Sequence, residues 1–96
     1  MFIGILRVEF VLHGNESLKD KRRVAQSLKQ KVRNKFNVAI AETGSENAMD
    51  ALALSIVSVS NSKRHLESRL RLCLNAIQAS CDEELVYDDL EILGAE

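Results

Sequence analysis

The chain has 96 residues, of which 46% are hydrophobic and 28% charged, and its formal net charge is −1 at pH 7. These values predict one domain spanning residues 1–96 and exclude both a disordered chain and a membrane-spanning one. The apolar start, Met1 to Leu6, ends at Arg7 and is too short for the hydrophobic region of a signal peptide or for a spanning helix. We therefore expect a cytoplasmic protein without a membrane partner.

The first half of the chain changes from a strand pattern to a helix pattern and back. Apolar and polar residues alternate over residues 2–12, which predicts a half-buried strand. Ser17 is positioned to cap a helix, and apolar residues then recur at helical spacing over residues 18–35. Alternation returns over residues 36–40 and predicts a second strand, which ends at the turn formers of residues 42–45.

The second half repeats this order. Residues 52–59 are apolar or small without clean alternation, which predicts a central strand buried on both faces. Asn61 or Ser62 can cap a second helix that extends to about residue 80. A final strand is expected after that helix.

The final strand completes a recognisable order of elements. It is predicted over residues 85–93, and its apolar phase changes at Asp88–Asp89, where we expect a bulge or an early end. The order β-α-β-β-α-β predicts an α+β, ferredoxin-like fold, with a four-stranded antiparallel sheet and both helices on one face. The first and third strands are expected in the middle of the sheet, and the second and fourth at its edges.

No residues form a recognisable catalytic or metal-binding motif. Cys73 and Cys81 are not part of a C-x-x-C pair, and neither has a His at a zinc-ligand offset, so we expect reduced thiols with Cys73 buried. The sequence also has no Walker loop, no G-x-S-x-G motif and no paired carboxylates expected to share a pocket. We therefore expect no enzymatic activity, no cofactor and no metal ion.

Charge is segregated along the chain. Residues 19–35 carry eight bases against one acid, whereas residues 82–96 carry seven acids and no base. Both predicted helices begin with bases, although the helix macrodipole disfavours cations in the first turns. An anionic partner would compensate that cost, which makes these bases the best functional signal in the sequence.

A single anion-binding surface is predicted from this pattern. Each helix follows a strand of the central pair, which we take as parallel, so both helix N-termini are expected at the same end of the sheet. Their free N–H groups and basic side chains would form a basic rim that binds phosphate. The predicted basic rim comprises Lys19, Lys21, Arg22, Arg23, Lys63, Arg64 and His65, together with His13 and Asn15.

The alternative is that the basic residues form a solvated helix face, neutralised by the acidic final strand within the molecule or across a dimer. With only three Phe, one Tyr and no Trp in the chain, a platform for stacking unpaired bases is not expected. Phosphate contacts are what remains for an RNA-binding role.

Several segments also resemble a known family. They are G-I-L-R-V-E at residues 4–9, Gly14, S-L-K-D-K-R-R at 17–23, F-N-V-A-I-A-E at 36–42, V-S-N at 59–61 and H-L-E at 65–67. The chain thereby resembles the YlxP-like family, small bacterial proteins classed as a domain of unknown function. The resemblance implies a ferredoxin-like fold and a gene often found among those for translation initiation, transcription elongation and ribosome maturation. Family members usually carry a Trp before the third strand, where this chain has N-A-M-D at 47–50.

These observations together predict a non-catalytic cytoplasmic protein that binds RNA or ribosomal particles through the basic rim. The alternative is a homodimeric structural or regulatory module without nucleic-acid binding. In that case the opposed charges, and an open sheet face bearing Ile3, Ile5 and Val11, would drive self-association.

Overall fold

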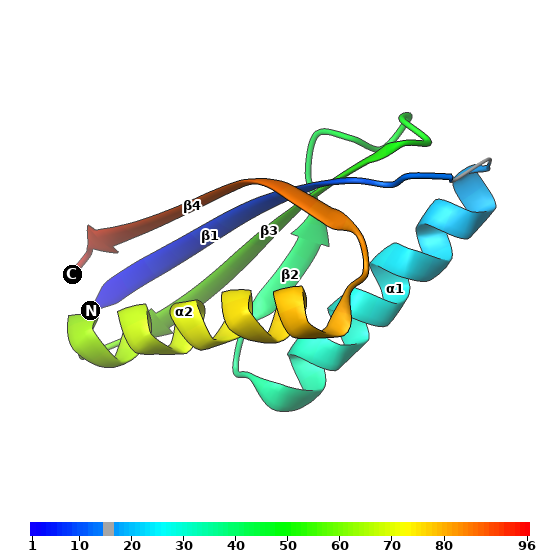
Figure 1. The fold of residues 1–96 in the computed structure, drawn as a ribbon. Coiled ribbons are helices and arrows are strands. Elements are labelled where there is room, and N and C mark those ends of the chain that lie inside the picture. Colours follow the sequence, from blue (N-terminus) through cyan, green and yellow to red (C-terminus); the bar gives the residue numbers. More distant parts are fainter. Residues whose placement is uncertain (15–16) are drawn as a thin grey trace.

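Six elements follow one another in the predicted order in the computed structural model, which describes residues 1–14 and 17–96 (Figure 1). They are β1 (Phe2–Val11), α1 (Leu18–Lys35), β2 (Ala39–Glu42), β3 (Ala51–Ser60), α2 (Lys63–Ser80) and β4 (Glu84–Gly94). The strands form one sheet in the order β2-β3-β1-β4, and every neighbouring pair is antiparallel. Both helices lie on one face of the sheet. The prediction of an α+β, ferredoxin-like fold is confirmed.

α1 begins at the predicted cap Ser17, and α2 begins at Ser62, one of the two predicted caps. The Ser17 hydroxyl accepts a hydrogen bond from the backbone N–H of Asp20 at 3.1 Å, and the Ser62 hydroxyl accepts one from the N–H of His65 at 3.2 Å. Each cap satisfies one of the N–H groups that a helix leaves without an internal partner. The helix spans 18–35 and 63–80 therefore agree with the predicted ones.

The core lies between the sheet and the two helices. Alternate residues of β1 and β3 meet the apolar stripes of α1 and α2. The buried core residues are Leu6, Val8, Phe10 and Leu12; Leu52, Leu54 and Ile56 with Ile40; Ala25, Leu28 and Val32; and Leu66, Leu70, Cys73 and Ile77. Burial alternates along β3, so the prediction that this strand is buried on both faces is wrong. The physical reason is that both helices cover the same face.

Two strands differ from their predicted limits. β2 begins at Ala39 rather than at Phe36, because Phe36 ends α1 and its N–H donates to the carbonyl of Val32 at 2.9 Å. β4 continues to Gly94, and its register against β1 shifts between Glu9 and Phe10. Glu9 faces Tyr87 whereas Phe10 faces Leu85, so the extra residue lies just before the predicted position. A bulge of this kind returns alternate side chains to the correct face.

In the part of the chain that the structure describes, neither helix combines the length and the apolar character needed to cross a bilayer.

Candidate functional site

The two helix N-termini lie at opposite ends of the sheet. β1 runs antiparallel to β3, with Val11 opposite Ala51 and Phe2 opposite Ser60. α1 follows the C-terminal end of β1 and α2 follows that of β3, so the two helices start far apart (Figure 1). The prediction of one shared rim is therefore wrong. Each crossover helix passes over an intervening antiparallel strand, which makes the central pair antiparallel rather than parallel.

This topology divides the predicted set of basic residues. Lys63, Arg64 and His65 are exposed in the first turn of α2, away from those that begin α1. His13 lies at the α1 end, where its Nε2 is 3.4 Å from a carboxylate oxygen of Glu84, so an acid already stands beside it. Asn15 falls outside the described residues.

Lys21 is the most unexpected member of the set. Its side chain is only 2% exposed, and its Nζ lies 2.7 Å from a carboxylate oxygen of Glu42. The same ammonium donates to the backbone carbonyl of Ala48 at 2.6 Å and to that of Ser45. Three acceptors therefore surround one buried cation, and Lys21 cannot contact an external anion.

A sequence signal for this burial exists. Lys21 precedes Ala25 by four residues and Leu28 by seven, which is the spacing of the buried stripe of α1. A lysine at such a position requires an acidic partner, because an unpaired charge is costly to bury. The predicted rim included Lys21 because the number of bases was considered without their position around the helix axis.

The loop between β2 and β3 is organised around Lys21. The Ser45 hydroxyl donates to Glu42 at 2.9 Å and accepts from the N–H of Ala53 at 2.8 Å. Hydrogen bonds from the backbone N–H groups of Glu46 itself and of Gly44 lower the pKa of the exposed Glu46 carboxyl. Lys21 and its acceptors thus fasten residues 42–48 to α1.

The remaining bases of α1 form what we call the α1 basic face: Lys19, Arg22, Arg23, Lys29, Lys31, Arg33 and Lys35. All are exposed except Lys29, which is half-buried. Arg23 is 3.9 Å from Asp20, and Arg33 donates to the carbonyl of Ile40 at 3.0 Å.

The other members are largely free. Lys35 lies over the ring of Phe36, 5.7 Å from its centroid. Lys19, Arg22, Lys29 and Lys31 form no ion pair with another described residue. Among the described residues, most of the positive charge of this helix therefore has no acidic partner.

The acidic strand does not neutralise the α1 basic face. β2 and β4 are the two edges of the sheet; α1 packs over β2, and α2 packs over β1, β3 and β4. On β4, Asp89 and Glu91 instead flank Arg7 of β1, whose guanidinium lies 3.5 Å and 3.3 Å from their carboxylates. Asp89 and Glu91 thus lie at the edge of the sheet opposite to the one that α1 covers.

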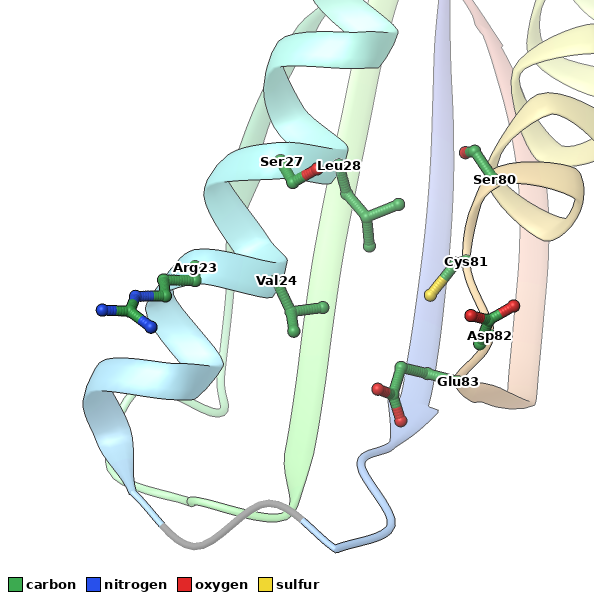
Figure 2. A pocket seen from close by; sticks show the side chains of 8 residues that line it. All are labelled: Arg23, Val24, Ser27, Leu28, Ser80, Cys81, Asp82 and Glu83. Atoms are coloured by element: carbon green, nitrogen blue, oxygen red, sulfur yellow. The ribbon is translucent and has the colours of Figure 1, made fainter.

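A cavity of about 320 Å³ lies between α1 and residues 80–83 (Figure 2). Val24 and Leu28 point into it from α1, and the Cys81 sulfur points into it from the other wall. Arg23 borders the cavity, but its guanidinium points away. Asp82 and Glu83 add two carboxylates. No nucleophile with an adjacent base converges here, and no cluster suited to a metal ion occurs among residues 1–14 and 17–96.

The two thiols should differ in reactivity. Burial raises the pKa of Cys73 to about 11, and burial also raises the pKa of the half-buried Cys81. A raised pKa lowers the thiolate fraction at a given pH, and only the thiolate reacts. We expect a thiol reagent at pH 8 to modify Cys81 slowly, faster as the pH increases, and Cys73 only after denaturation. Equal rates for both thiols in the native protein would contradict this.

Comparison with known proteins identifies the family. The sequence model of a family described as "Protein of unknown function (DUF503)" matches residues 3–89. The chain is also 34% identical to "Uncharacterized protein YlxP" of Bacillus subtilis (strain 168) over 77 residues, which cover 80% of this chain and 84% of that protein. The resemblance seen in the opening segments is therefore confirmed, and the chain belongs to the DUF503 family of proteins of unknown function.

Proposed function

We propose that this protein is a non-catalytic cytoplasmic RNA-binding protein that contacts phosphates through the α1 basic face. Its target is RNA, either free or within ribosomal particles. The observation that carries the proposal is the set of bases on the solvent side of α1, most of which lack an ion-pair partner among the described residues. The proposed binding surface therefore lies on α1 alone, and not on the basic rim that was predicted from both helix N-termini.

The length of α1 suits a run of phosphates. Lys19 and Arg33 lie fourteen residues apart on the same side of α1, which corresponds to roughly 21 Å along its axis at a rise of about 1.5 Å per residue. Bases spread over such a length can contact several phosphates of one nucleic acid. Contacts of this type position a protein without reading sequence.

Base stacking has little support on this surface. Phe10 is buried, Phe2 and Phe36 pack against the core, and Tyr87 lies on the opposite face of the sheet. The binding energy should therefore come from charge, as in nucleic-acid binding that is sensitive to salt and tolerant of sequence.

The alternative function is a homodimeric structural or regulatory module that does not bind nucleic acid. It is favoured by the apolar side chains on the uncovered face of the sheet, whose partner is argued in the next subsection. Since the ferredoxin-like fold serves many functions, the two roles have to be separated by experiment.

Matched charge removal tests the proposal. Arg22→Gln with Lys29→Gln removes two charges from the α1 basic face, and Lys63→Gln with Arg64→Gln removes two from the start of α2. We expect the first pair to weaken binding of a structured RNA at low salt about tenfold or more, since each lost phosphate contact lowers affinity. The α2 pair should change binding far less.

Two results would contradict the proposal. Equal weakening by both pairs would mean that only net charge matters. Absence of binding to RNA and to ribosomal particles by the unmutated protein at low salt would leave the dimeric module as the function.

A further inference from the structure

The face of the sheet opposite the helices carries apolar side chains with nothing over them. Val57, Val59 and Leu93 are 36%, 52% and 43% exposed, and Tyr87 is also exposed. These are four of the eight large hydrophobic side chains exposed in the described part of the chain. The register places them on the same face as Ile3 and Ile5 of β1. A patch of this kind marks an interaction surface.

The edges of the sheet are poorly suited to self-association. β2 has only four residues, and its Ile40 carbonyl already accepts a hydrogen bond from the guanidinium of Arg33. β4 carries a register shift and the acids Asp88, Asp89 and Glu91. Short strands, bulges and charges all oppose edge-to-edge pairing. The open face is therefore the surface left for a second copy.

We call the side of the sheet opposite the helices the open face. One half of it carries large side chains (the tall half), and the other half carries mainly small ones (the shallow half). On β1 the open face presents Ile3, Ile5, Arg7, Glu9 and Val11, and on β4 Tyr87, Asp89, Glu91 and Leu93. On β2 and β3 it presents mainly small side chains, namely Ala39, Ala41, Ala51, Ala53 and Ser55, with Val57 and Val59 at one end. A flat partner would leave gaps over the shallow half, whereas a second copy turned about a suitable axis would fill them.

We propose that two copies of this chain pack open face to open face about a two-fold axis that runs along the strands between β1 and β3. Rotation about this axis leaves positions along the strand direction unchanged. Residues at one level, meaning register partners across the sheet, therefore face residues at the same level in the other copy. Ile3 then lies over Val59 of the partner subunit, and Ile5 lies over Val57 of the partner subunit, because these residues are register partners within one copy. The tall half of each copy covers the shallow half of the other.

A hollow on the open face supports this axis. A cavity of about 280 Å³ is lined by Asn37, Ala39, Val57 and Val59, with Val38 and Ser58, at the end of the sheet where β2 has not yet begun. Leu93 is at the same level on the opposite edge, since Ile3 pairs with both Val59 and Leu93. The two-fold axis therefore places Leu93 of each copy at the hollow of the other.

Charge is complementary in the same arrangement. Asp89 and Glu91 would lie over Ala41 and Ala39 of the partner subunit, which occupy the same levels of the sheet. The guanidinium of Arg33 lies at that edge, against β2. Asp89 and Glu91 of one copy thus lie over the edge strand whose Ile40 carbonyl accepts from Arg33 in the other copy.

The area is adequate if the whole face is used. Three strands of ten or eleven residues and the four-residue β2, about 4.8 Å apart and rising about 3.3 Å per residue, make a face of roughly 550 Å². A standard interface buries about 800 Å² per partner, counted over the corrugated surface of the side chains. Both α1 basic faces stay exposed on the outside of the dimer, so the inference does not depend on RNA binding.

Sedimentation at micromolar concentrations tests the interface. Val57→Asp places a carboxylate against Ile5 of the partner subunit and should raise the dimer dissociation constant about tenfold or more, because a charge cannot be buried there unpaired. Leu72→Asp is the matched control, since Leu72 is 54% exposed on α2. A monomeric native protein over this range, or equal effects of the two variants, would overturn the inference.

Cross-linking tests the axis. Facing sheets lie about 10 Å apart, which is beyond the reach of a disulfide, so a short bifunctional maleimide is used. In a Cys81→Ser background, Leu93→Cys combined with Asn37→Cys should give covalent dimers, and either cysteine alone should not. Efficient dimer formation by Leu93→Cys alone would show a different axis.

Discussion

Replacing Lys21 by methionine is expected to lower the free energy of unfolding by about 3–5 kcal/mol, the usual cost of removing one partner from a buried ion pair. Methionine keeps most of the volume of lysine but has no donor for Glu42, Ser45 or Ala48, all of which the ammonium contacts. The carboxylate and two carbonyls would then lack the cation that compensates their burial. Urea denaturation followed by circular dichroism measures the loss.

Lys19→Met is the control for this prediction. Lys19 lies two residues earlier in α1, is exposed and forms no ion pair with a described residue. Its replacement removes the same charge and should change stability by no more than about 0.5 kcal/mol, as is usual at the surface. Equal effects of the two substitutions would show that Lys21 does not hold the β2–β3 loop to α1.

Gly4→Ala is expected to destabilise the protein by about 1–3 kcal/mol, because the added methyl group overpacks the contact between β1 and α2. A Cβ at this position would lie 2.5 Å from Cδ1 of Leu70, 3.0 Å from Cγ of Leu66 and 3.2 Å from Cδ1 of Ile92. Either α2 moves away from the sheet or these side chains leave their preferred rotamers. Thermal or urea denaturation detects the change.

Gly94→Ala provides the matched strand control. Gly94 pairs with Phe2, and a Cβ there would meet only Cε1 of Phe2, at 4.0 Å. We therefore expect this variant to keep the native stability or exceed it slightly, since alanine is less flexible than glycine when unfolded. If both glycine variants lost the same stability, close packing of α2 over Gly4 would not be the cause.

Local patterns predicted the elements because each signal is short in range. The caps Ser17 and Ser62, the apolar stripe of α1 and the alternation of β1 depend only on neighbouring residues. Strand direction is different. The predicted antiparallel sheet, with the first and third strands side by side, already required β1 and β3 to run in opposite directions, as they do, and taking this central pair as parallel contradicted that topology. The error over the shared rim arose at this step.

The sequence predicted that the candidate site is rich in bases, but it did not predict which of those bases are free to bind an anion. The excess of bases on residues 19–35 is visible in the sequence, and it remains on the surface of α1. Which bases are free is decided by tertiary contacts, such as Glu42 beside Lys21 and Asp20 beside Arg23. Helical phase could have identified Lys21 as buried, whereas its acceptors on residues 45 and 48 could not have been identified.

The salt dependence of RNA binding is the most direct test of the α1 basic face. For single-stranded RNA, the logarithm of the association constant should fall linearly with the logarithm of salt concentration, by about 0.7 per phosphate contact. Arg22→Gln with Lys29→Gln should make this slope shallower by about 1.4, while Lys63→Gln with Arg64→Gln should leave it unchanged. A slope that the first pair does not alter, or affinity that is independent of salt, would contradict phosphate binding by α1.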